Sequence, residues 1–119
     1  MKENRVVVTG IGAVTPNALG VKDFNDALQQ GKSGIQYWEE LTRLNFRCQI
    51  GGVPPLTDEY IDSLLPEYFS KKISNKAIIY SCLSGVEAWL DAGLPVQSDI
   101  RDPESGIVFG AGDLGFDSL

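Results

Sequence analysis

The chain has 119 residues, of which 43% are apolar and 22% are charged. This balance is typical of a folded globular protein, and the length is enough for one domain with a core but too short for a complete two-domain enzyme. Sixteen acidic and ten basic residues give a formal charge of −6, which argues against a nucleic-acid partner, because a surface that follows phosphates clusters Lys and Arg. The only local basic candidates, Lys71, Lys72 and Lys76, are interpreted as the solvated start of a helix.

The N-terminus and the hydropathy pattern bear on where the protein works. The four polar residues before the first apolar run leave no room for a secretion signal. No apolar run approaches the roughly 20 residues that span a bilayer, and no basic amphipathic face is present. We therefore expect a cytoplasmic protein without a membrane association.

The first elements are a strand, an irregular turn and a helix. Val6, Val7 and Val8 form a β-branched run, which is typical of a strand buried on both faces of a parallel sheet. The glycines at positions 10 and 12 then turn the chain, and Pro16 delays any helix. Apolar residues at helical spacing predict a helix over residues 21–30, ended by Gly31 as C′ residue.

The middle of the chain carries weaker signals. Residues 31–44 lack a sustained period, so we expect a loop with one turn of helix. Residues 46–53 favour an edge strand or a surface hairpin, since two glycines and two prolines close the run. Thr57 is the predicted N-cap of a short helix that begins with two acidic residues and ends at Pro66.

The clearest predicted helix covers residues 75–92, with Ser74 as candidate N-cap and with Gly93 and Pro95 as its stop. It is apolar around much of its circumference, which is typical of an interior helix. Residues 106–109 form the second predicted core strand, followed by a glycine-rich turn. Two buried strands and an interior helix without partners would expose large apolar surfaces, so we expect a truncated or cleaved chain, or one bound to its other half.

The glycine-rich turn at residues 110–115 fits the GxGxxG pattern of dinucleotide-binding folds literally. The fingerprint needs a helix N-terminus aimed at a pyrophosphate, whereas Asp113 places a negative charge at this turn and no helix follows it. Nucleotide binding is therefore the weaker interpretation. The earlier turn at residues 10–15 fails the pattern at its last position and is interpreted as a structural turn.

Nucleophilic catalysis requires a Cys or Ser activated by a base, usually His, and the chain contains no His. Cys82 lies among apolar residues of the predicted interior helix, and Cys48 has no CxxC partner. Both cysteines are predicted to be small buried hydrophobic residues rather than nucleophiles, metal ligands or disulfide partners. The neighbouring carboxylates at positions 39 and 40 and at positions 58 and 59 are interpreted as solvated surface charge.

Several landmarks in order resemble the opening of the elongating β-ketoacyl-[acyl carrier protein] synthases. They are the sequence VVVTGIGAVTP at residues 6–16, LG at 19–20, GKSGI at 31–35, DAGL at 91–94, and the strand and glycine turn at 107–112. The resemblance covers the whole chain and is loose between residues 38 and 69.

This resemblance implies an α/β, thiolase-like fold, in which each half of the intact enzyme has a mixed five-stranded sheet layered with helices. Residues 1–119 would be an incomplete N-terminal thiolase-like ketoacyl synthase domain. Family members are dimeric, use no cofactor, and condense an acyl chain held on a cysteine with malonyl-[acyl carrier protein], assisted by two histidines. None of these three catalytic residues is expected in this chain.

The resemblance also implies one local role. In the family, the residue after the Gly-x-Gly of the second strand's turn lines the acyl pocket, which points here to Gly112 and Asp113. An unpaired carboxylate facing an acyl chain would carry a heavy desolvation cost, so Asp113 turns away, or the parent enzyme takes a polar acyl chain, or the loop is disordered. A non-catalytic ketosynthase-like chain-length factor is the alternative to an enzyme.

Overall fold

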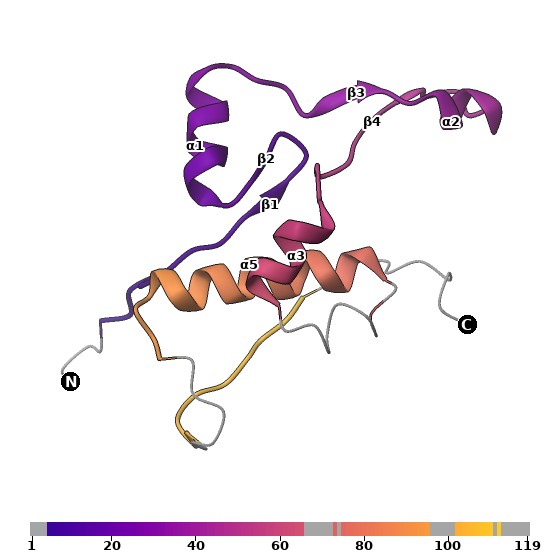
Figure 1. Ribbon diagram of the computed structural model, residues 1–119. Helices are drawn as coiled ribbons and strands as arrows, with labels where there is room; N and C mark the ends of the chain where they lie inside the picture. The colour runs from indigo at the N-terminus through magenta and orange to yellow at the C-terminus, as the bar shows by residue number, and fades with distance from the viewer. Residues whose placement is uncertain (1–4, 66–72, 74, 96–101, 111, 113–119) are drawn as a thin grey trace.

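A computed structural model describes residues 5–65, 73, 75–95, 102–110 and 112. The described elements are four helices and four short strands, arranged as a body, a projecting arm and extended segments (Figure 1). In chain order they are β1 (Val14–Thr15), β2 (Ala18–Leu19), α1 (Val21–Gln29), β3 (Ile35–Tyr37), α2 (Glu39–Arg43), β4 (Ile50–Gly52), α3 (Asp58–Leu64) and α5 (Lys76–Asp91).

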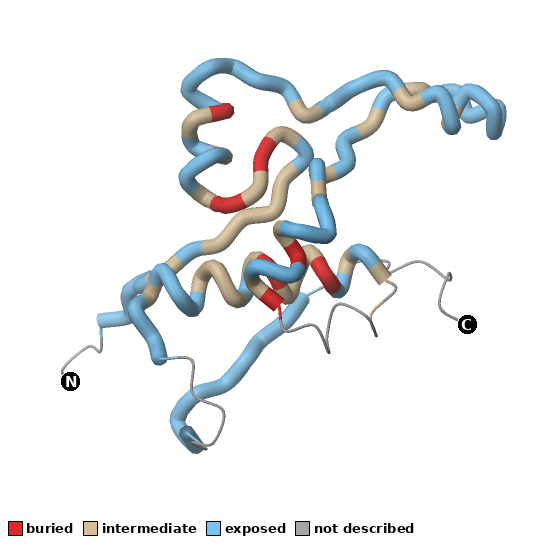
Figure 2. The backbone as a smooth tube through the Cα atoms, in the orientation of Figure 1, coloured by how far each residue is buried: buried red, intermediate tan, exposed pale blue. Residues whose placement is uncertain are grey.

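The core lies where α3 crosses α5. Its buried residues are Ile61 and Leu65 from the α3 segment and Ile79 and Leu83 from α5, and Figure 2 shows these buried positions gathered around the crossing. Leu83 is 1% exposed, and Val14, Tyr60 and Cys82 are among the partly buried residues that pack against the cluster. Burial of apolar surface at this crossing therefore supplies the main packing interaction in the described part of the chain.

The segment before α1 forms a tight hairpin that the sequence did not predict. β1 pairs antiparallel with β2, with Val14 opposite Leu19 and Thr15 opposite Ala18. The Thr15 hydroxyl donates to the Ala18 carbonyl and to Asn17 Oδ1, at 3.0 and 2.8 Å. These bonds close the turn around Pro16 and set the direction in which α1 begins.

The arm consists of β3, α2 and β4. β3 and β4 pair antiparallel, with Ile35 opposite Gly52 and Tyr37 opposite Ile50, and Trp38 Nε1 donates to the Gly51 carbonyl at 3.0 Å. Cβ atoms placed on Gly34 or Gly52 would lie 2.5–2.9 Å from atoms of Pro16. The base of the arm therefore fits closely around this proline, while the arm itself projects away from the body (Figure 1).

The two predicted core strands are not strands in the described structure. Val8 is 82% exposed and Val108 is 101% exposed, and the sheets found among the described residues, β1–β2 and β3–β4, include neither segment. The β-branched pattern was right for an extended chain but wrong about burial here. A strand needs a hydrogen-bonding neighbour, and the described residues provide none for residues 6–8 or 106–109.

The helix predictions fared better. α1 is confirmed to one residue, since it ends at Gln29 where residue 30 was predicted. Gly31 follows the C-cap in the left-handed region with φ 65°, as predicted, and Lys32 N donates to the Ala27 carbonyl. Thr57 is confirmed as the N-cap of α3, because its hydroxyl accepts from Tyr60 N at 3.2 Å. For α5 the predicted cap was wrong: Asn75 caps the helix, with Oδ1 accepting from Ala77 N at 2.9 Å, while Ser74 lies outside the described residues.

The hairpin prediction for residues 46–53 is also confirmed, although the strand is limited to β4. Residues 31–44 contain the expected turn of helix, α2, together with strand β3. The interior position predicted for α5 holds for one face only, because Trp89 and Leu90 are 42% and 48% exposed.

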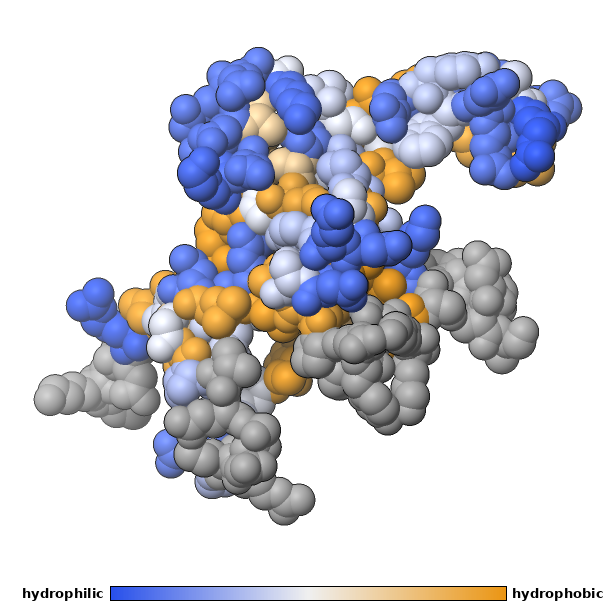
Figure 3. Space-filling view, in the orientation of Figure 1, coloured by the Kyte–Doolittle hydropathy of each residue, from blue (hydrophilic) through white to orange (hydrophobic). Residues whose placement is uncertain are grey.

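The surface of the molecule is divided by polarity. Figure 3 shows hydrophobic side chains gathered around α5 at the centre and hydrophilic side chains over α1. The predicted solvated carboxylates are confirmed: Glu39, Glu40, Asp58 and Glu59 are exposed in the first turns of α2 and α3. Lys76 is exposed at the start of α5, whereas Lys71 and Lys72 lie outside the described residues.

Candidate functional site

The acyl-pocket position implied by the resemblance falls at the edge of the described structure. Gly112 is exposed, and no atom lies within 4 Å of the position that its Cβ would take. Asp113 lies outside the described residues. The pocket role of Gly112 and Asp113 therefore remains a prediction.

The first glycine turn, at residues 10–15, packs directly against the backbone of α5. This contact agrees with its interpretation as a structural turn. A Cβ on Gly10 would lie 2.2 Å from the Ala88 carbonyl oxygen, and one on Gly12 would lie 2.0 Å from the Ser84 carbonyl oxygen. Only a residue without a side chain lets the backbone approach a helix this closely. Small residues at positions 84, 88 and 92 recur at helical spacing and make room for the turn.

Two carboxylates of α5 bind the backbone of this turn. Asp91 Oδ2 accepts from Ile11 N at 3.0 Å, and Glu87 Oε2 accepts from Ala13 N at 2.8 Å. Glu87 Oε1 also accepts from Val21 N at 2.7 Å. These amides are therefore engaged within the protein and do not face an outside phosphate.

The bond to Val21 compensates for a missing cap on α1. The N-cap residue Gly20, at φ 80°, has no side chain to satisfy the first amides of the helix. A carboxylate at a helix N-terminus is favourable because it accepts an orphan N–H and complements the helix dipole. Sequence reasoning missed this role, although Glu87 and Asp91, four residues apart on a largely apolar helix, were a visible signal.

Tyr60 of α3 lies near Glu87, and both side chains approach the position that a Cβ on Gly20 would take. Partial burial raises the pKa of the Tyr60 hydroxyl above its ordinary value of 10.0, and the negative charges of Glu87 and Asp23 raise this pKa further. Both charges disfavour a phenolate at this position. Tyr60 is therefore a neutral group at physiological pH.

Neither cysteine is arranged as a nucleophile. Cys82 is partly buried and packs against the core cluster, as expected. The prediction for Cys48 was wrong, because it is exposed in the loop of the arm, where its thiol donates to the Ile50 carbonyl at 3.6 Å. The apolar pattern around Cys48 belongs to a projecting hairpin and not to a core.

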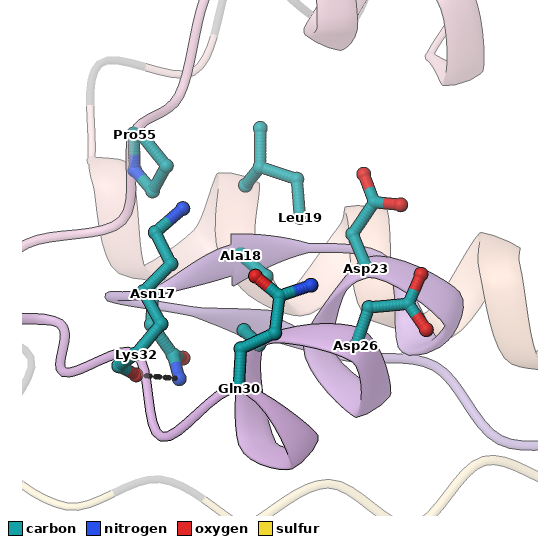
Figure 4. Close-up of a pocket in the computed structure, with 9 residues that line it drawn as sticks. Asn17, Ala18, Leu19, Asp23, Asp26, Gln30, Lys32 and Pro55 are labelled. Atoms are coloured by element: carbon teal, nitrogen blue, oxygen red, sulfur yellow. Dashed lines mark hydrogen bonds between the residues drawn. The ribbon is translucent and has the colours of Figure 1, made fainter.

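A shallow pocket of about 350 Å³ lies between α1 and the turn at Asn17. Asp23 and Asp26 border one side and Lys32 and Pro55 the other, and Asn17 Nδ2 donates to the Lys32 carbonyl at 3.0 Å (Figure 4). Asp26 also pairs with Lys22 at 3.2 Å. The described side chains that line this pocket include no thiol or imidazole.

Over the described residues, no group of His, Cys, Asp and Glu side chains could hold a metal ion. Within the same residues, no helix is long and apolar enough to cross a membrane. The described geometry thus offers a tightly seated glycine turn and its carboxylate acceptors, but no assembled catalytic centre.

Comparison with known proteins identifies what the chain is similar to. The family model described as "Beta-ketoacyl synthase, N-terminal domain" matches residues 3–116. The chain is 32% identical over 122 residues to 3-oxoacyl-[acyl-carrier-protein] synthase 2 of Vibrio harveyi, covering 100% of this chain and 28% of the relative.

Two further relatives bear the name 3-oxoacyl-[acyl-carrier-protein] synthase 1. That of Buchnera aphidicola subsp. Schizaphis graminum is 33% identical over 112 residues, which cover 91% of this chain and 26% of the relative. That of Escherichia coli K12 is 31% identical over 109 residues, which cover 91% of this chain and 26% of the relative. The chain therefore spans about a quarter of the length of these relatives.

Proposed function

Since the chain belongs to the β-ketoacyl synthase family, we propose that it is part of a β-ketoacyl-[acyl carrier protein] synthase. Such an enzyme condenses an acyl thioester with malonyl-[acyl carrier protein] in fatty-acid or polyketide synthesis. The observation that carries this proposal is the family match over residues 3–116, in agreement with relatives named 3-oxoacyl-[acyl-carrier-protein] synthases.

The chain would be an incomplete N-terminal domain of a thiolase-like fold, spanning residues 1–119. The segments at residues 6–8 and 106–109 would be strands of its mixed sheet, with neighbours supplied by the remainder of the intact enzyme. Their exposure among the described residues supports this proposal, because apolar segments in water are costly unless another part of the protein covers them.

By itself the chain would be inactive in condensation. It contains no His, and neither Cys48 nor Cys82 lies beside a base that would make it a thiolate nucleophile. The intact enzyme would be a cytoplasmic homodimer or heterodimer that binds acyl carrier protein and needs no cofactor. Gly112 and Asp113 would contribute to the wall of its acyl pocket.

A non-catalytic chain-length factor is the second candidate, because it would share this fold and the same N-terminal landmarks. The two candidates differ in whether the intact protein has a cysteine at the family's nucleophile position. Dinucleotide binding has less support, since the relatives are named 3-oxoacyl-[acyl-carrier-protein] synthases.

The test is the intact mass of the material purified from its native host, under native and then denaturing conditions. We expect a longer parent polypeptide or a second bound chain that contains the nucleophilic cysteine and two histidines. That species should release CO₂ from malonyl-[acyl carrier protein] in the presence of an acyl thioester. A parent without the cysteine would favour the chain-length factor, and condensation by the 119-residue species alone would refute the proposed inactivity.

A further inference from the structure

Glu87 joins three parts of the molecule: helix α5, the turn before β1 and the start of α1. It projects from α5 and accepts one amide from the strand β1 side, at Ala13, and one from the first residue of α1, at Val21. Asp91, one turn further along α5, accepts the Ile11 amide. Three amides spread over residues 11–21 are thus held by two carboxylates of one helix.

The attachment of α1 to the body depends on few other contacts. The main packing partner of α1 is strand β2, whereas the buried core is formed by α3 and α5. Only Ala27 of α1 is buried, and Figure 1 shows α1 lying beside the β1–β2 hairpin and away from α5. Hydrogen bonds to an ionised acceptor are among the stronger ones in proteins, so they weigh heavily where apolar burial is small.

We propose that Glu87 and Asp91 form a carboxylate latch, which holds residues 10–21 on α5 and without which this segment and α1 detach as a local unit. The α3–α5 core remains folded when the latch opens, because its four buried side chains come from outside the segment and only the partly buried Val14 leaves its place against them. Tyr60 of α3 lies close enough to Glu87 for the carboxylate charge to raise the pKa of its hydroxyl, and the charge of Asp23 acts on Tyr60 in the same direction. Tyr60 is neutral at physiological pH and therefore adds no charge that would oppose the latch.

The latch rests on the hydrogen bonds and not on the proposed condensing function. Its test is amide hydrogen exchange, measured residue by residue at neutral pH in the complete chain. In Glu87→Gln, one acceptor oxygen becomes an NH₂ group facing a donor. One of the amides of Ala13 and Val21 then loses its acceptor and the other loses the charge of its acceptor, so we expect these two amides, and those of α1 that detach with them, to exchange on the order of tenfold to a hundredfold faster.

Matched measurements separate a latch from a general loss of stability. The Leu83 amide in the core should keep its rate in Glu87→Gln, and Glu104→Gln, which removes the same charge from an exposed side chain, should change none of these rates. Asp91→Ala, which removes the acceptor of the Ile11 amide altogether, should accelerate Ile11 most and the other amides of residues 10–21 with it, and it tests the latch if Glu87→Gln does not fold. The proposal is overturned if the Ala13 and Val21 rates stay unchanged in a folded Glu87→Gln variant, if Leu83 accelerates equally, or if Ile11 is unaffected by Asp91→Ala.

Discussion

Gly12 and Gly85 differ in the space that surrounds the position of an added Cβ. A Cβ on Gly12 would lie 2.0 Å from the Ser84 carbonyl oxygen and 2.8 Å from Ala88 N, both of them backbone atoms that cannot move aside. No atom lies within 4 Å of a Cβ on Gly85, which sits exposed inside α5. Gly12→Ala should therefore destabilise the protein by about 1–3 kcal/mol through overpacking.

Gly85→Ala is the matched control, because the same methyl group there meets open space and improves helix propensity. It should stabilise the protein by roughly 0.5–1 kcal/mol. Urea denaturation measures both changes as shifts of the midpoint. A Gly12→Ala variant as stable as the wild type would show that the turn does not sit on α5.

The raised pKa of Tyr60 makes the free energy of unfolding decrease at alkaline pH. Its folded-state pKa is raised, chiefly by burial and then by Glu87 and Asp23. Above pH 10 the unfolded chain therefore ionises Tyr60 more readily than the folded chain does, and stability falls as pH rises. Tyr60→Phe should lose less stability than the wild type between pH 9 and about pH 11, measured by urea denaturation across that range. An equal loss in both proteins would remove Tyr60 as a cause.

At the residue scale, local chemistry was predictable and distant contacts were not. Gly31 and Thr57 were identified from their neighbours alone, because a C′ glycine and an N-cap threonine act within one turn of a helix. Cys48 was predicted to be buried although it lies in the segment predicted as an edge strand or surface hairpin, and it is exposed. The partners of Glu87 are 66 and 74 residues away in sequence, and no local pattern encodes such a separation.

At the scale of elements, α5 depends on its N-cap. Asn75 Oδ1 accepts from Ala77 N, and the first turn of α5 contains no acidic residue that would supplement it. Asn75→Ala should cost about 1 kcal/mol of folding free energy, and Asn75→Ser should restore most of it because serine is an equally good cap. Thermal unfolding followed by circular dichroism compares the three proteins, and identical midpoints would contradict the capping role.

Helices were predicted well and short strands poorly, because a long element repeats its apolar period and a short one does not. A helix of nine to sixteen residues repeats its apolar period several times, so α1 and α5 were found nearly to their ends. β1 and β2 have two residues each, too few for any alternation to be read. Their pairing depends on the turn at Pro16 and on the bonds made by Thr15.

At the scale of the whole molecule, family membership came from the order of landmarks along the chain and is confirmed by the family match. The candidate acyl-pocket residues were predicted from the resemblance alone, and Asp113 lies outside the described residues. The burial of the two β-branched segments was mispredicted because burial is a property of neighbours. A sequence pattern shows that a strand can be covered on both faces, but not that the covering layers are present.

The exposed segments at residues 6–8 and 106–109 lead us to expect self-association of the 119-residue protein in solution. Val6 and Ile107 are 93% and 92% exposed, and short uncharged runs of high β propensity pair readily between molecules. We expect self-association that grows with concentration, measured by size-exclusion chromatography with light scattering. The double variant Val6→Lys/Val108→Lys should associate less while keeping its helix content by circular dichroism.

The two added lysines of Val6→Lys/Val108→Lys lower the magnitude of the net charge, which by itself would increase association, so reduced association cannot be attributed to charge. Two added lysines bring the formal charge from −6 to about −4, and a smaller net charge by itself favours association. The control Gln29→Lys/Gln36→Lys changes the charge equally at exposed sites of α1 and β3, outside both segments. If both double variants associate as much as the wild type, another surface mediates contact between molecules. If only Val6→Lys/Val108→Lys stays monomeric, the exposed segments are the pairing edges.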